Sequence, residues 1–302
     1  MSYDYGNARI AAMRGRLFDR AAIARLGESA TASVMVVQLE RAPDWAPIMR
    51  RVAPLGTDAT VALETAVEYH RSARLGALPL YYDGRDRRFV EALVMPLDAE
   101  RALSLLRRRR AGEAAEAIAT TAAPGAMLDA SAVAAMARAP GLAAVLRPLV
   151  DREIISRGDA VPIIAAYTRG AASAQVESLL QAAVDRARWR RVEGRGDEAA
   201  ALRRQFGQEQ AARQATVMEL AEAGPALATV LERTTRLAGL DALSALGRRD
   251  PLGIGAVAGY VAAVEAQAIR LRAMIARVRA RWSAEDAAPY LARSERPAWL
   301  AS

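Results

Sequence analysis

One apolar stripe near the C-terminal end limits the possible folds more than any other feature of the chain. From position 254 to position 282, apolar residues recur at alternating steps of three and four, which is the spacing of one face of a long α-helix. The stripe consists of Ile254, Val257, Val261, Val264, Ala268, Leu271, Ile275, Val278 and Trp282. A helix of this length spans about 40 Å. Because Asp250 is a suitable N-cap and Pro251 a suitable first helical residue, we expect the helix to begin there.

Three glycines, Gly253, Gly255 and Gly259, lie at the start of this stripe and raise the alternative of a phosphate-binding loop. A dinucleotide loop follows directly on a buried strand, and a P-loop ends on a lysine. Here the preceding residues, 240–249, have a helical pattern, and the chain contains no lysine. We therefore expect no bound nucleotide, and we interpret Gly255 and Gly259 as helix-packing residues that let another helix approach closely. Leucine at either position should damage folding, whereas alanine should be mild.

Helical spacing of apolar residues recurs along most of the chain, so the fold class is predicted to be all-α. The segments with this spacing are residues 8–26, 59–78, 98–110, 173–192 and 222–240. In the third of them, Asp98 is expected to be an N-cap, followed by buried Ala102, Leu105 and Leu106. Only residues 33–39 and 79–83 resemble short strands, and the first of these lies inside an apolar segment of helical length.

Two breaks divide the chain into three parts of similar size. One is at Pro124-Gly125 and the other at Gly224-Pro225. An acidic residue opens an alanine-rich helix in each part, and an apolar, arginine-containing run closes it. The pattern predicts three related helical lobes, 1–124, 125–224 and 225–302, within one compact subunit.

Composition excludes several classes of site. The chain has 302 residues, no cysteine and a single histidine, so disulfides, thiolate metal sites and sites built on several histidines are excluded. The net charge of +8 comes entirely from arginine and favours an acidic partner, which would be a protein face, nucleic acid or anionic lipid. Nucleic acid is the weakest of these, because aromatic residues make up only 5% and few bases could be stacked. Neither a signal peptide nor a membrane span is expected.

The residues that could carry chemistry are few, and each has a structural interpretation beside the functional one. His70 with Glu64 and Glu68 could serve an α-helical enzyme. The alternatives are a half-exposed structural histidine and a solvated pair of carboxylates. The run Arg107, Arg108, Arg109 and Arg110 could bind an acidic partner, or it could simply complement the dipole at a helix C-terminus. We assign no catalytic, cofactor-binding or metal-binding residue and expect no cofactor.

Two segments resemble a known family, the C-type subunits of the archaeal and bacterial A/V-type rotary ATPases, whose vacuolar counterparts are the d-type subunits. They are Tyr3 to Phe18 and Asp250 to Trp282, which together cover about a sixth of the chain. The matching residues are Tyr5, Asn7, Ala8, Arg9, Met13, Arg14 and Leu17 in the first segment, and Asp250 to Gly253, Tyr260, Glu265 and Arg270 to Arg272 in the second. The Asp/Glu-x-Asn-Leu element frequent in the family is absent, since residues 97–103 and 196–202 lack its asparagine.

The resemblance implies an all-helical funnel of three similar lobes around a pseudo-threefold axis. It implies a non-catalytic, peripheral subunit on the cytoplasmic face of the membrane. There it would link the central stalk to the membrane rotor ring and pass torque between ATP turnover and ion transport. Alone, the chain is expected to be a monomer that binds no nucleic acid and does not insert into the membrane. The competing hypothesis from the residues is a basic α-helical repeat protein that binds nucleic acid or another protein.

Overall fold

The computed structural model describes the whole chain apart from residues 1–2, 56–57, 197, 206, 208–239 and 282–302. Every element of regular structure among the described residues is a helix, which confirms the all-α prediction. Two compact units are present. The middle unit runs from Ser72 to Arg195, and the terminal unit contains the described residues before and after it.

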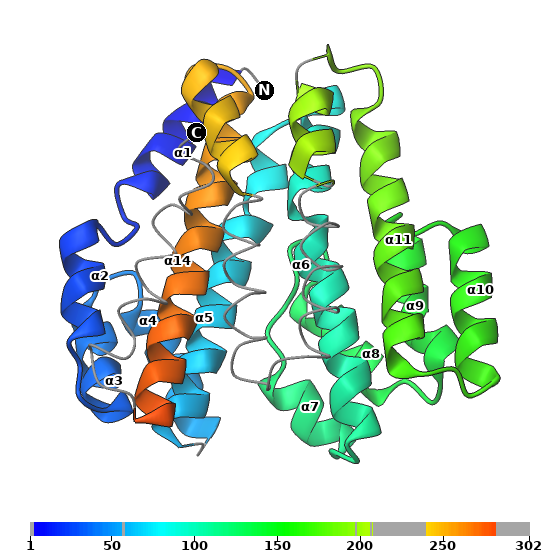
Figure 1. The fold of residues 1–302 in the computed structure, drawn as a ribbon, viewed down its shortest axis with the longest axis horizontal. Coiled ribbons are helices and arrows are strands. Elements are labelled where there is room, and N and C mark those ends of the chain that lie inside the picture. Colours follow the sequence, from blue (N-terminus) through cyan, green and yellow to red (C-terminus); the bar gives the residue numbers. More distant parts are fainter. Residues whose placement is uncertain (1–2, 56–57, 197, 206, 208–239, 282–302) are drawn as a thin grey trace, which may run out of the picture. The chain divides into compact units, whose positions relative to one another are not determined.

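The middle unit is built around two long helices that pack side by side, α6 (Gly84–Arg110) and α11 (Ser173–Val192) (Figure 1). Four shorter helices complete it: α7 (Ala115–Thr121), α8 (Ala130–Arg138), α9 (Leu142–Asp151) and α10 (Arg157–Thr168). The short 3-10 helix η2 (Leu78–Tyr81) precedes them. Polar side chains cap the N-termini of α8 and α10. Asp129 accepts a hydrogen bond from Ala132 N at 2.8 Å, and Ser156 accepts one from Asp159 N at 3.0 Å. Leucine, valine, isoleucine and alanine side chains from α6 to α11 form one core.

Helix α6 departs from the prediction at Asp98. Ala102, Leu105 and Leu106 are buried as expected, but the helix begins at Gly84 and continues through Pro96, so Asp98 is an interior residue and not an N-cap. Its carboxylate is fully buried and accepts hydrogen bonds from the backbone amides of Met127 and Leu128 at 2.9–3.1 Å. Asp98 does satisfy free amides, as a cap would, but these amides belong to the loop between α7 and α8.

This loop contains the predicted break at Pro124-Gly125. A Cβ atom at Gly125 would collide with Asp98 Oδ1, so the close approach requires glycine there. Arg101 Nε donates to the carbonyl oxygen of Pro124 at 3.0 Å, and Ser72 Oγ donates to the same oxygen at 2.5 Å. The break is therefore a loop held against α6. The helices that precede and follow this loop, α7 and α8, pack against each other within the middle unit.

Stability should depend on pH through Asp98. Burial raises the pKa of its carboxyl to about 6, because desolvation of the charge outweighs the amide hydrogen bonds of Leu128 and Met127. A raised native pKa means that the protonated form stabilises the fold and that this contribution is lost as the pH rises from about 4 to about 6. Relative to Asp98→Asn, the wild type should lose at most about 3 kcal/mol of unfolding free energy over this window. Urea unfolding of both proteins at pH 4 and pH 7 measures the effect, and a difference that does not change with pH would contradict it.

The terminal unit combines helices from both ends of the chain. Its first part contains α1 (Tyr3–Arg14), α2 (Arg20–Gly27), α3 (Ala32–Arg41), α4 (Ala46–Val52), the 3-10 helix η1 (Ala53–Leu55) and the portion of α5 (Ala59–Gly76) up to Arg71. Its second part contains helical residues 198–205 and 240–249, followed by α14 (Gly255–Ala280). Asp19 and Thr31 cap α2 and α3 by accepting hydrogen bonds from Ala22 N and Val34 N. The strand-like residues 33–39 are thus helical, and residues 78–81 form η2.

Helix α14 carries the stripe that the sequence predicts. Seven of the predicted positions, from Ile254 to Ile275, are buried, Val278 is half-buried, and Trp282 lies outside the described residues. The predicted start is wrong, because residues 251–254 form a bend and the helix begins at Gly255. Asp250 nevertheless serves the new start, since its carboxylate oxygens accept hydrogen bonds from Gly253 N and Gly255 N, both at 2.9 Å. Pro251 is therefore in the bend and not in the first turn.

The three predicted lobes remain a prediction. The boundary at Gly224-Pro225, and the helical segment 222–240 up to position 239, lie outside the described residues. The described residues form two compact units, and the boundary between them falls within α5 and after α11, not at the predicted breaks.

Candidate functional site

The two segments on which the family resemblance rests lie against each other in the terminal unit, although about 245 residues separate them. Helix α1, dark blue in Figure 1, packs beside α14, which is orange. The side-chain amide of Asn7 donates hydrogen bonds to the carbonyl oxygens of Leu252 and Gly253, the second at 3.3 Å. Phe18 N donates to Gln267 Oε1 at 2.8 Å and forms a second link between the segments.

The bend before α14 presents side chains to the surface. Leu252 is 83% exposed and Tyr5, on α1, is 45% exposed. The guanidinium of Arg9 lies 5.5 Å from the centre of the Tyr5 ring, and its Nε donates to Tyr5 Oη at 3.2 Å. An apolar leucine, a tyrosine and a cation therefore occupy the surface beside the Asn7 contact, which is a combination suited to contact with another protein.

Gly255 and Gly259 lie where residues 240–249 cross the start of α14. A Cβ atom on Gly259 would lie 3.2 Å from the Cα atom of Gly247. A Cβ atom on Gly255 would lie 2.7 Å from the carbonyl oxygen of Leu246. Both glycines face backbone at distances that leave little or no room for a side chain. The prediction that alanine is mild therefore applies to Gly259 far better than to Gly255.

Glu64 and Glu68 are paired with arginines of α14. Glu68 binds Arg272, and Glu64 Oε1 lies 3.2 Å from Arg279 Nη1. One helical turn further along α5, Arg71 Nη2 lies 2.7 Å from Glu265 Oε1. The expectation of a solvated carboxylate face is correct only for the exposed Glu64 pair. The other two pairs, Glu68 with Arg272 and Glu265 with Arg71, are largely shielded from water, and Arg71 is only 2% exposed.

His70 is buried and does not have the predicted half-exposed position. Its exposed fraction is 3%, and its ring is stacked on that of Trp45 with the centroids 4.1 Å apart. Trp45 in turn stacks on Phe18 at 5.6 Å. The side chain thus belongs to an aromatic stack in the core of the terminal unit, which is the structural interpretation of this residue.

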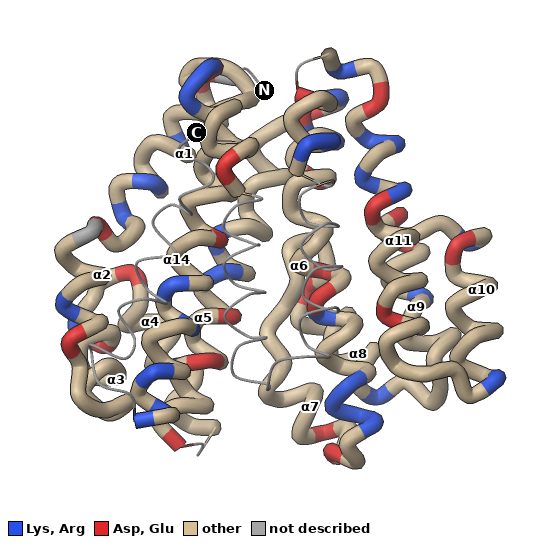
Figure 2. The backbone as a smooth tube through the Cα atoms, in the orientation of Figure 1, with Lys and Arg blue, Asp and Glu red and all other residues tan. Residues whose placement is uncertain are grey.

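The arginine run at the end of α6 makes contacts within the middle unit. Arg107 Nε donates to Glu177 Oε1 at 2.9 Å, and Arg108 Nε donates to Glu113 Oε2 at 2.7 Å. Arg110 donates to Ser173 Oγ and lies over the Tyr167 ring, 5.1 Å from its centre. Arg109 belongs to the last turn of the helix, where a cation complements the dipole. Acidic positions accompany basic ones on most of the helices in Figure 2. Partner binding by this run stays a prediction.

Sequence reasoning did not reach the contacts between distant segments. It identified Asn7 and Glu265 only as family-like positions, and nothing in their local spacing indicates the distant atoms that they bind. The one sequence signal for these contacts was that two family-like segments lie at the two ends of one chain. Two such segments can belong to one packing interface.

Among the described residues, no group of three or more His, Cys, Asp and Glu side chains has an arrangement that could hold a metal ion. No helix within the described ranges combines the length and apolar character needed to cross a bilayer. Comparison with known proteins finds no family model that matches the chain and no curated protein that matches it significantly.

Proposed function

We propose that this chain is a non-catalytic subunit of a V/A-type rotary ATPase, in the position of the C-type subunits. It acts as a socket between the central stalk and the membrane rotor ring, and it passes torque between ATP turnover and ion transport. Its place is peripheral, on the cytoplasmic face of the membrane. In this proposal the helices form three similar lobes around a pseudo-threefold axis, and the lobes enclose a funnel that receives the stalk.

The observation that carries the proposal is the Asn7 contact with Leu252 and Gly253. Asn7 and the bend at positions 250–253 are family-like at opposite ends of the sequence, and each holds the other in place. Glu265, a third family-like position, pairs with the buried Arg71. The resemblance therefore concerns residues that support one packing arrangement.

The packing of α14 also fits the mechanical task. Transmission of torque requires a body that does not shear when one end is turned against the other. Glycine contacts at backbone distance and interlocking helices resist such sliding, because a packed interior has few alternative arrangements. The ion pairs from α5 to α14 add a fixed register along the helix. The exposed Leu252 and Tyr5 are candidates for contact with the stalk or the ring.

Purification of the tagged chain from its native membranes tests this assignment. The expected result is recovery of stalk and rotor-ring proteins in fixed ratio with the chain, resistant to nuclease treatment. The replacement Leu252→Asp should reduce this recovery if the bend contacts a partner, whereas Leu80→Asp is a control at another exposed leucine, in the middle unit. Recovery of nucleic acid in place of ATPase components would favour the basic repeat protein and contradict the proposal.

A further inference from the structure

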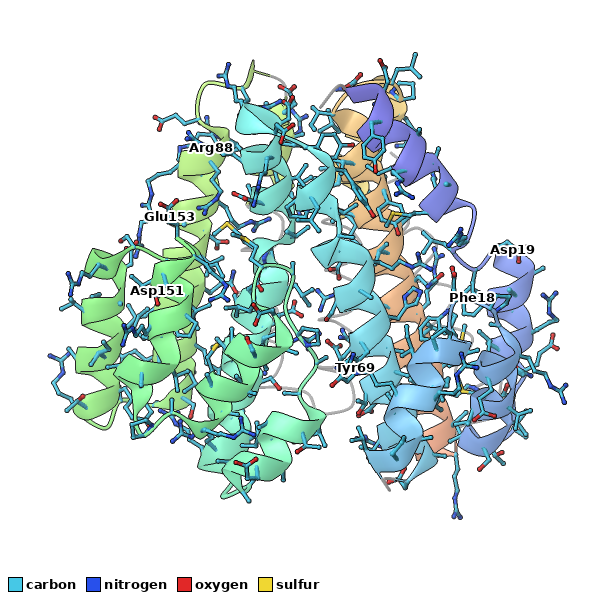
Figure 3. The ribbon with its side chains drawn as sticks, turned by 180° about the vertical axis from the view of Figure 1, so that it is seen from behind. Phe18, Asp19, Tyr69, Arg88, Asp151 and Glu153 are labelled. Carbon is cyan, nitrogen blue, oxygen red and sulfur yellow. The ribbon has the colours of Figure 1, made fainter. Side chains whose placement is uncertain are left out.

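A basic groove in the middle unit has no role in the proposed function. Its volume is about 470 Å³, and its charged lining consists of Arg88, Glu91, Glu153, Arg157, Arg190 and Arg191. These residues come from α6, the loop between α9 and α10, the start of α10, and the end of α11. Val150 and Ile155 add an apolar part. Figure 3 labels Arg88 and Glu153, which lie one above the other on the same side of this unit.

The charges in the groove do not balance. Four arginines face two glutamates, and one arginine, Arg191, approaches both glutamates, with nitrogen–oxygen distances of 3.5 Å to Glu91 and 3.9 Å to Glu153. Arg190 lies 3.6 Å from Asp159, but Asp159 is bound more closely by Arg186, at 2.6 Å. Among the described residues, Arg88 and Arg157 form no ion pair. The lining thus carries two cations in excess of its two carboxylates.

The backbone around the groove is already fixed in position. Glu153 has a φ of 56°, in the left-handed region, and its carbonyl oxygen accepts a hydrogen bond from Arg191 Nη1 at 2.9 Å. Ser156 caps α10, which extends over twelve residues, so the positive end of its dipole lies at the groove. A left-handed backbone conformation is unfavourable for glutamate and raises the conformational energy locally. Strained residues of this kind are found at functional sites.

From these observations we infer that the groove binds a phosphate group. A phosphate monoester or inorganic phosphate carries a charge near −2 at neutral pH, which matches the excess of two cations. Its several oxygens accept hydrogen bonds from guanidinium groups that approach from different directions, as these arginines do from three helices. The phosphate could belong to a free anion or to the headgroup of a lipid such as phosphatidic acid. The inference is independent of the rotary assignment, because it requires neither stalk nor ring.

Calorimetry on the full chain in a buffer without phosphate tests the inference, with inorganic pyrophosphate and inorganic phosphate as probes. We expect saturable binding by the wild type. In the double variant Arg88→Gln/Arg157→Gln, binding should weaken by at least about ten-fold, because two charge-assisted hydrogen bonds are lost. The matched control is Arg147→Gln/Arg169→Gln, which removes two exposed arginines of the same unit outside the groove and should leave the affinity unchanged.

Vesicle flotation distinguishes the two sources of phosphate. Vesicles of phosphatidylcholine with phosphatidic acid should bind the wild type and the control but not the groove variant if the ligand is a lipid headgroup. Phosphatidylcholine alone should bind none of them. Saturable binding of either source that is lost in the groove variant supports the inference. Absence of binding to both sources, or equal binding by groove variant and control, overturns it. Groove-dependent binding of a polyglutamate peptide without pyrophosphate binding would also overturn it, in favour of a carboxylate-bearing partner.

Discussion

Replacing Gly255 with leucine is expected to prevent stable folding of the terminal unit. Even the first side-chain carbon at this position would lie 2.7 Å from the carbonyl oxygen of Leu246 and 2.8 Å from that of Asp250. Backbone cannot move aside as a flexible side chain can, so the start of α14 would have to separate from residues 240–249. We expect a loss of about 3 kcal/mol or more, which is a large share of a typical stability of about 5–15 kcal/mol.

Alanine replacements at the same contact should distinguish its two glycines. Gly255→Ala places its Cβ against backbone at under 3 Å and should destabilise the protein, although alanine is the better helix former. In Gly259→Ala the nearest atom to the new Cβ is the Cα atom of Gly247, at 3.2 Å, and the effect should be milder. Thermal and urea unfolding measure both. Gly158→Leu, in α10 with its nearest neighbour at 3.8 Å, is the matched control for added bulk. Equal stability of Gly255→Leu and this control would mean that the contact is not formed.

Replacing Glu265 with glutamine is expected to destabilise the protein by about 3 kcal/mol, the second-largest effect. Arg71 is 2% exposed, so its charge has little access to water when its carboxylate partner becomes neutral. Removal of one member of a buried pair typically costs about 3–5 kcal/mol, because the remaining charge stays buried. Glutamine keeps an acceptor oxygen for Arg71 Nε, which now donates to Glu265 Oε1 at 2.8 Å, and this places the expected cost near the lower limit.

Two comparisons make the Glu265 prediction specific. Glu64→Gln removes a carboxylate from the exposed pair with Arg279 and should change stability by at most about 1 kcal/mol. The double replacement Arg71→Met/Glu265→Leu removes both charges of the pair and should restore most of the stability lost in Glu265→Gln, since neither member is left buried without the other. Urea unfolding at pH 7 gives all three values. An equal effect of Glu265→Gln and Glu64→Gln would contradict the buried character of the pair.

Local patterns in the sequence predicted the features that depend on neighbouring residues. The steps of three and four along α14 identify its buried face because side chains at this spacing share one side of a helix. The glycines at 255 and 259 indicate a close approach because a helix interior otherwise disfavours glycine. In each case the physical cause lies within a few residues of the residue that reveals it.

The remaining features depend on partners that are distant in sequence. Aspartate is a residue type typical of N-caps, but Asp98 lies inside a longer helix. It binds the amides of a loop about 30 residues away. In the sequence, Glu68 and Glu265 resemble ordinary surface carboxylates. Their partners, Arg272 and Arg71, lie on another helix and are found only in the folded structure. Likewise, the arginines of the groove belong to three separate helices, and only their assembly creates an excess of charge. No local period encodes these pairings.

The central claim is that this chain couples ATP turnover to ion movement. The most direct measurement is ATP-driven ion uptake, recorded together with ATP hydrolysis, by membrane vesicles stripped of the chain and then supplied with it. We expect that stripped vesicles show no uptake, that the detached catalytic head still hydrolyses ATP, and that added wild-type chain restores uptake while misfolded Gly255→Leu protein does not. Full uptake by vesicles without the chain would contradict the proposed coupling role.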